Sequence, residues 1–130
     1  MIYLDSSAVL KLIFDEAESD VLQTWLTERP GVPWVSSELA KIEVVRATRR
    51  YAPDSVPTAR AVIAQINLVP IDSSATDQAA EVGDPMLRTL DAIHLASALS
   101  VRDHLTAFVA YDLRLAAAAQ AHGLTVDAPG

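Results

Sequence analysis

Four acidic residues stand where carboxylates could perform chemistry. Asp5 ends the apolar run MIYLD, and Asp112 ends a second apolar run, TAFVAYD. Asp91 lies near the start of RTLDAIHLASAL, whose apolar residues recur at helical spacing. Glu43 lies within SELAKIEVVRATRR, on an apolar stripe that we expect to face inward. Because an isolated buried carboxylate is costly, we expect Glu43 to have a partner inside the fold.

Each of these acids also has an explanation that involves no chemistry. Asp5, Asp91 and Asp112 are placed to cap helices, since aspartate is favoured at a helix N-terminus and in the first turn. Glu43 could pair with Arg46, three residues later on the same helix. This alternative describes a metal-free interaction module without catalytic activity. For Asp91 we predict both roles, a helix cap and a ligand.

The elements that would position the acids follow from the hydrophobic pattern. Strands are predicted at 1–5, 34–37, 67–72, 106–112 and 124–129, and helices at 6–14, 16–28, 38–51, 55–67, 73–82, 88–99 and 113–122. We expect Ser6 or Ser7 to cap the first helix and Gly123 to follow the last. Short apolar strands that alternate with helices indicate a parallel sheet covered on both faces. The prediction is a single α/β domain over residues 1–130, a three-layer α/β/α sandwich.

In such folds, ligands bind beyond the carboxyl ends of the strands. Asp5 and Asp112 lie there, so we expect all four acids to converge on one edge of the sheet. Carboxylates within a few ångströms of each other repel, which raises their pKa values. A hard divalent cation removes this penalty, and oxygen ligands without cysteine suit Mg²⁺ or Mn²⁺.

Composition narrows the classes of function. Ten basic and seventeen acidic residues give a net charge of −7, which argues against a general nucleic-acid binder unless a local basic patch or bound cations offset it. Cysteine is absent, which excludes disulfides and thiolate metal sites. No apolar run approaches the roughly 20 residues that cross a bilayer, and MIYLDSSAV lacks the basic start of a signal peptide. We therefore expect a cytoplasmic protein without a membrane partner.

Four segments, in order along the chain, resemble a known family. IYLDSSAVLKLI, SSELAKIEVVRA, LRTLDAIHLASAL and VAYDLRLAAAAQAHGLTVDAPG are similar to motifs of the PIN-domain ribonucleases, and more narrowly to the VapC toxins of VapBC toxin–antitoxin systems. The resemblance implies a metal-dependent endoribonuclease that inhibits translation or growth when free of its VapB-like antitoxin. It also implies a homodimer.

By position, the resemblance assigns the Mg²⁺ or Mn²⁺ ligands and catalytic acids to Asp5, Glu43, Asp91 and Asp112. Ser6 or Ser7 would lie beside the metal or the substrate phosphate. Many relatives have Thr or Ser where this chain has Ala110, and some have a further acid just after the last one, where this chain has Leu113, Arg114 and Leu115. The number of metal ions is therefore left open.

RNA must approach this acidic chain through basic residues. A rim that binds phosphates could be formed by the lysine and arginine residues in or beside the motifs: Lys11, Lys41, Arg46, Arg49, Arg50, Arg88 and Arg114. Arg46, one turn from Glu43, is the best candidate for a substrate contact. For His94, one turn beyond Asp91, the surrounding AIHLA favours a packing or helix-surface role over acid–base catalysis.

Two other enzyme classes with an aspartate after the first strand fit less well. A haloacid-dehalogenase-type phosphatase needs a second aspartate two residues after the first, where this chain has Ser7. A response-regulator receiver needs an acidic pair near the first strand and a late lysine, and the chain has neither.

Overall fold

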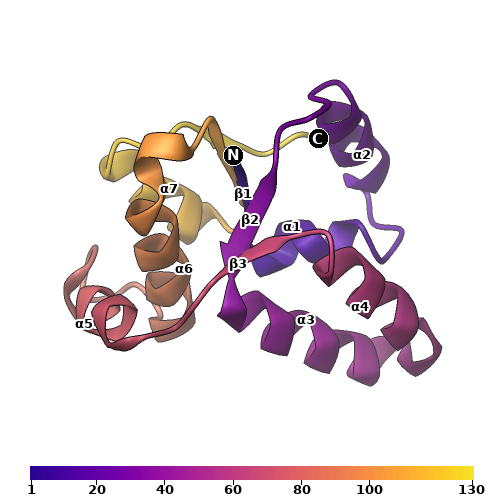
Figure 1. Cartoon of the computed structure of the whole chain (residues 1–130), viewed down its shortest axis with the longest axis horizontal. Helices are drawn as coiled ribbons and strands as arrows, with labels where there is room; N and C mark the ends of the chain where they lie inside the picture. The colour runs from indigo at the N-terminus through magenta and orange to yellow at the C-terminus, as the bar shows by residue number, and fades with distance from the viewer.

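A five-stranded, all-parallel sheet lies at the centre of the molecule (Figure 1). The computed structural model describes all 130 residues. The strands are arranged in the order β3-β2-β1-β4-β5, with bounds β1 (Ile2–Leu4), β2 (Trp34–Ser37), β3 (Asn67–Val69), β4 (Ala107–Val109) and β5 (Val126–Asp127). In the register of the central strand, Ile2 lies opposite Trp34 on one side and Ala107 on the other.

Helices cover both faces of the sheet, which confirms the predicted three-layer α/β/α sandwich. Figure 1 shows one group beside each face. The first group is α1 (Ser6–Lys11), α2 (Ser19–Thr27), α3 (Glu38–Tyr51) and α4 (Val56–Ile63), and the second is α5 (Ser73–Glu81), α6 (Thr89–Ser100) and α7 (Leu113–Ala121). Short 3₁₀ turns occupy Pro53–Ser55 and Arg102–His104.

The alternation of side chains along β1 builds two separate cores. Ile2 and Leu4 pack in a cluster with residues of α1 to α4, whereas Tyr3 packs on the opposite face with residues of α6 and α7. Tyr3 stacks on Phe108 of β4 with ring centroids 5.0 Å apart. Because both faces of the strand are filled, a ligand can reach it only at an end.

The order of the strands determines which end. The chain continues from β1 to β2 on one side and later returns to β4 on the other side of β1. Such a reversal in strand order opens a crevice at the carboxyl ends of the two flanking strands. Asp5 follows β1 directly and Asp112 follows β4 by three residues, so both lie at this crevice.

All of the predicted helices and strands are present, but most are shorter than predicted. The first helix ends at Lys11 instead of Phe14, and the last strand has two residues instead of six. The prediction that Ser6 or Ser7 caps α1 was wrong, because the Asp5 carboxylate takes that role. Gly123 follows α7 as predicted, with a φ of 84° that favours glycine.

No helix of the structure is both long enough and apolar enough to cross a bilayer.

Candidate active site

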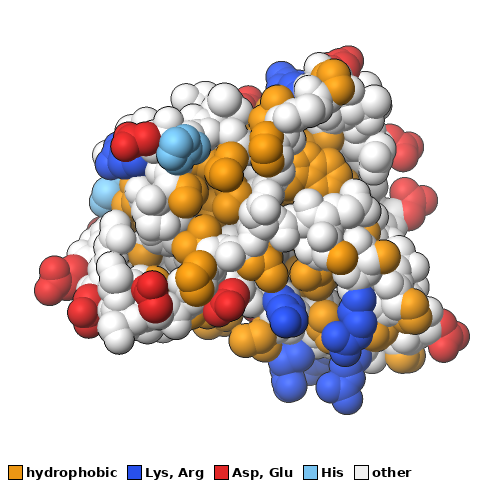
Figure 2. Space-filling view, viewed as in Figure 1, with side chains coloured by type: hydrophobic (Ala, Val, Ile, Leu, Met, Phe, Trp, Pro, Cys, Tyr) orange, Lys and Arg blue, Asp and Glu red, His pale blue; other side chains and the backbone are white.

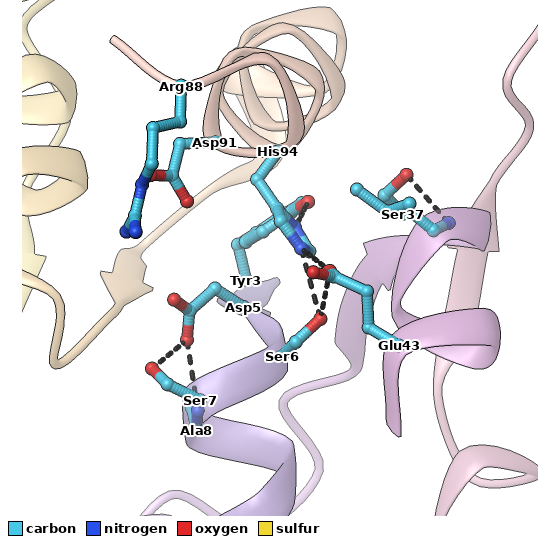
Figure 3. Close-up of polar contacts among 11 residues, drawn as sticks. Tyr3, Asp5, Ser6, Ser7, Ala8, Ser37, Glu43, Arg88, Asp91 and His94 are labelled. Atoms are coloured by element: carbon cyan, nitrogen blue, oxygen red, sulfur yellow. Dashed lines mark hydrogen bonds and ion pairs between the residues drawn. The ribbon is translucent and has the colours of Figure 1, made fainter. Parts of the chain in front are cut away.

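Asp5 is a buried carboxylate at the carboxyl end of the central strand. Its side chain is 4% exposed and accepts hydrogen bonds from the Ala8 N–H at 2.9 Å and the Ser7 hydroxyl at 2.7 Å (Figure 3). Burial raises the pKa of Asp5, and these two hydrogen bonds only partly oppose the effect. The negative charge of Asp91 raises this pKa further, so the two carboxylates are close enough to repel each other.

Ser7 forms hydrogen bonds to residues that follow both β1 and β4. Besides donating to Asp5, its hydroxyl accepts a hydrogen bond from the Tyr111 N–H at 3.3 Å. Tyr111 immediately precedes Asp112, so Ser7 links the start of α1 to the loop that carries the last acid. Ser7 therefore lies beside Asp5, while its predicted position beside a metal or a substrate phosphate stays a prediction.

Asp91 and Asp112 share one arginine. The Arg88 guanidinium lies 3.2 Å from the Asp91 carboxylate through Nε and 2.9 Å from the Asp112 carboxylate through Nη2. The hydrogen bond and charge of Asp91, followed by the charge of Asp112, raise the pKa of Arg88. Asp112 also caps α7 by accepting from the Arg114 and Leu115 N–H groups, as expected.

The predicted capping role of Asp91 was wrong. The N-cap position of α6 is Arg88, whose side chain makes no capping hydrogen bond, and Asp91 lies in the first turn. Its carboxylate turns toward the Arg88 guanidinium instead of the free N–H groups of the helix. Asp91 still lies in the first turn of α6, near the positive end of the helix dipole, where an acidic side chain stabilises a helix.

Glu43 is held by two donors from other helices. The Ser6 hydroxyl donates to Glu43 Oε1 at 2.6 Å, and His94 Nε2 lies 2.9 Å from the same oxygen (Figure 3). Partial burial alone would raise the pKa of Glu43, but the hydrogen bonds from His94 and Ser6 outweigh it and lower this pKa below its usual range. The predicted pairing of Glu43 with Arg46 is absent, because these contacts hold the carboxylate inside the fold.

His94 connects Glu43 to the core. Its ring is buried, 3% exposed, and Nδ1 lies 2.8 Å from the hydroxyl of Tyr3 on β1. Because a carboxylate only accepts hydrogen bonds, Nε2 carries a hydrogen toward Glu43, and in a neutral ring Nδ1 would then accept from the Tyr3 hydroxyl. The sequence correctly favoured packing for His94 but missed that the ring contacts a site acid.

The four acids lie around one end of the sheet but do not form a ready-made metal site. No three acidic or histidine side chains are placed closely enough to hold a metal ion. Arg88 joins Asp91 to Asp112, Ser6 and His94 hold Glu43, and Asp5 lies within electrostatic reach of Asp91 and His94. The predicted assignment of the four acids as metal ligands, and of Ser6, Ser7 and Arg46 as substrate contacts, stays a prediction.

Comparison with known proteins identifies the family. The sequence model of the PIN-domain family matches residues 2–121 of this chain. Ribonuclease VapC35 of Mycobacterium tuberculosis is 45% identical over all of this chain and 98% of its own length. The chain belongs to the VapC family of PIN-domain ribonucleases. Ribonuclease VapC47 of the same organism is 38% identical, again over all of this chain and 98% of its own length.

A solved structure supports the fold. The crystal structure of Mycobacterium tuberculosis VapC20, described as a sarcin–ricin loop cleaving toxin, superposes on 99% of this chain and 100% of its own with a TM-score of 0.77. The two sequences are 15% identical, so this likeness concerns the α/β sandwich alone. Family membership disfavours the alternative of an interaction module whose acids only cap helices.

Proposed function

We propose that this chain is a Mg²⁺- or Mn²⁺-dependent endoribonuclease that acts as the toxin of a toxin–antitoxin pair. The observation that carries the proposal is Asp5, a carboxylate buried at the crevice between β1 and β4 and facing a second carboxylate, Asp91. Asp5 caps α1, but a neutral asparagine could supply the same cap, so the stability of the fold does not explain an ionisable acid at this buried position. A buried carboxylate whose pKa is raised by burial and by a neighbouring acid is typical of a functional site.

The donor set suits a hard divalent cation. The chain has no cysteine, and the acids offer oxygen ligands of the kind that Mg²⁺ and Mn²⁺ prefer. Positive charge near Asp5 would oppose the effects of burial and of Asp91 on its pKa. We expect Asp5, Asp91 and Asp112 to hold the cation, with Glu43 as a further ligand or as a partner of bound water. The Arg88 guanidinium occupies one oxygen of Asp91 and one of Asp112, so we expect it to move when the cation binds.

The reaction is hydrolysis of a phosphodiester bond. Water adds to phosphorus, the bond from phosphorus to the leaving oxygen breaks, and that oxygen takes up a proton. A divalent cation, when bound, stabilises charge on the phosphoryl oxygens and makes water easier to deprotonate. Glu43, whose lowered pKa keeps it ionised at neutral pH, would accept a hydrogen bond from the attacking water. The Ser6 hydroxyl fixes the direction of that carboxylate.

Cleavage of RNA should depend on both the cation and Asp91. We expect purified protein to degrade total RNA in Mn²⁺, to stop when EDTA is added, and to resume when Mn²⁺ exceeds the chelator. Asp91→Asn should lower the cleavage rate about 10²-fold or more, because the variant loses a carboxylate that would hold the cation at the reaction centre. Electrophoresis of the RNA measures this, with Asp77→Asn on the exposed surface of α5 as the control. Cleavage by the wild type that continues in EDTA, or cleavage by Asp91→Asn at the wild-type rate, would contradict the proposal.

The partners are part of the proposal. We expect a VapB-like antitoxin to place a basic side chain among the acids, and the fit of the Arg88 guanidinium between Asp91 and Asp112 supports this. Exposed apolar side chains near the site, such as Met86 and Leu113, offer surface for the antitoxin or for a homodimer.

We also propose that the protein works in the cytoplasm, where its RNA substrate is found.

A further inference from the structure

Basic residues are concentrated on two helices beside the site. The segment from α3 to α4, residues 38–63, contains five of the ten lysine and arginine residues, namely Lys41, Arg46, Arg49, Arg50 and Arg60. With three acidic residues its net charge is +2, whereas the rest of the chain carries five basic and fourteen acidic residues, a net charge of −9. Figure 2 shows the resulting concentration of basic side chains over α3 and α4. The acidity of the chain is therefore not uniform.

These five side chains have no acidic or hydrogen-bonding partner within the chain. All five are exposed, and none takes part in an ion pair or donates a side-chain hydrogen bond. Lys11 and Arg88, in contrast, are both engaged with carboxylates. The basic residues of α3 and α4 are therefore free to bind an external anion.

The basic residues line three neighbouring hollows, the first of which lies beside Glu43. A hollow of about 670 Å³ beside Glu43 is lined by Arg46, Arg50 and Tyr51 of α3 and by Leu90 of α6, the residue before Asp91. A second hollow shares Arg46 with the first and adds Lys41 and Arg60. A third hollow shares Lys41 and Arg60 with the second and reaches β3. We call these neighbouring hollows together the α3–α4 groove, defined by Lys41, Glu43, Arg46, Arg50, Tyr51 and Arg60.

The end of α3 adds an exposed aromatic ring. Tyr51 is 74% exposed, and the Arg50 guanidinium lies 5.9 Å from the centre of its ring. An exposed tyrosine has no role in the core, and the chain contains only seven aromatic residues. Aromatic rings beside cations are the combination with which proteins bind single-stranded nucleic acid, since the cations hold phosphates and the ring stacks on a base.

We propose that the α3–α4 groove binds single-stranded RNA and leads the strand to the acids. Lys41, Arg46, Arg50 and Arg60 hold its phosphates, and Tyr51 stacks on a base. The inference rests on the proposed ribonuclease function, because it assigns the substrate of that activity to a particular surface. RNA fits better than an acidic protein segment, since RNA supplies flat bases as well as negative charge.

Binding to RNA in the absence of divalent cations tests the groove without any catalysis. The probe is a fluorescein-labelled, mixed-sequence 2′-O-methyl oligoribonucleotide of 12 nucleotides, measured by fluorescence anisotropy in EDTA. The double variant Arg46→Gln/Arg50→Gln should bind at least about tenfold more weakly. It should also lower the slope of log K against log salt by about 1.4, or about 0.7 for each phosphate that the variant no longer neutralises. Tyr51→Ala should weaken binding roughly 5- to 150-fold, and Tyr51→Phe should restore it.

The matched control removes the same charge elsewhere. Arg29→Gln/Arg102→Gln lowers the net charge equally at exposed positions outside the groove, and its affinity should stay within twofold of the wild type. Weaker binding in the groove variants alone supports the proposal. It is overturned if the control loses as much affinity as the groove variant, if Tyr51→Ala binds as the wild type does, or if oligoglutamate of equal charge displaces the RNA as well as unlabelled RNA does.

The groove and the enzymatic activity can fail separately. If the wild type cleaves total RNA in Mn²⁺ but the groove variants bind the probe normally, the groove proposal alone is wrong. If the wild type binds the probe through the groove but cleaves no RNA, the proposed function is wrong.

Discussion

Asp5→Asn is expected to slow RNA cleavage strongly and at the same time to stabilise the metal-free protein. Asparagine retains an oxygen that can accept the hydrogen bonds of Ala8 and Ser7, so the cap of α1 survives. It removes the buried negative charge and its repulsion with Asp91. We expect cleavage to fall about 10²- to 10³-fold, and the Tm without metal to rise by roughly 3–5 °C, about 1 kcal/mol in a domain of this size.

The gain in Tm should depend on pH in one direction. The pKa of Asp5 is higher in the folded protein than in the unfolded chain, so the native state favours the protonated, uncharged side chain. Below about pH 4 Asp5 is protonated in the native state, and the variant should have little advantage. As pH rises through the pKa of Asp5 in the folded protein, wild-type Asp5 ionises. The Tm of Asp5→Asn should then become higher than that of the wild type.

Thermal unfolding in EDTA from pH 4 to pH 8, with gel assays of cleavage in Mn²⁺, measures both effects. Asp77→Asn is the control, since it removes an exposed acid that has no ion pair, and neither its Tm nor its cleavage should change. A variant at position 5 that still cleaves RNA, or one that unfolds well below the wild type, would show that Asp5 serves the fold and not the reaction.

His94→Ala is expected to lower both stability and cleavage. The substitution leaves the buried Tyr3 hydroxyl without its partner and opens a cavity between β1 and α6. We expect the free energy of unfolding to fall by about 3 kcal/mol, which lowers the Tm by roughly 10 °C. Glu43 is also left with one donor instead of two, and removal of such an orienting hydrogen bond typically lowers activity about 10- to 100-fold.

Tyr3→Phe separates these two effects. It removes the hydroxyl that contacts His94 Nδ1 but leaves both donors to Glu43 in place. We expect a decrease of about 1–2 kcal/mol in stability and less than a threefold change in cleavage, measured at a temperature where both variants are folded. An equal decrease of cleavage in the two variants would mean that His94 acts through the core and not by positioning Glu43.

Much of the fold was predictable because the strands are short, apolar and separated by helices. MIYL, WVSS and TAFV contain enough apolar residues to indicate burial on both faces, and the helices between them require parallel pairing. The boundaries were less predictable, since both Asp5 and Ser6 can cap a helix. The choice depends on where β1 ends, which tertiary packing decides.

The site was predictable where local sequence determines position. Asp5 and Asp112 end apolar runs, so their place at the edge of the sheet follows from the strands alone. The Arg88–Asp112 pair joins residues from different elements, which no local pattern indicates. His94 did leave a signal, because the pattern of α6 indicates a helix buried on most sides, and a histidine there needs hydrogen-bond partners.

Titration of the metal-free protein with Mn²⁺ by isothermal calorimetry is the measurement that addresses the chemistry most directly. Asp5 and Asp112 come from opposite ends of the chain, so a single ion can depend on both only if the fold brings them together. We predict saturable binding by the wild type that weakens at least tenfold in Asp5→Asn and equally in Asp112→Asn. Wild-type affinity in either variant would contradict the assignment of these acids to one cation site.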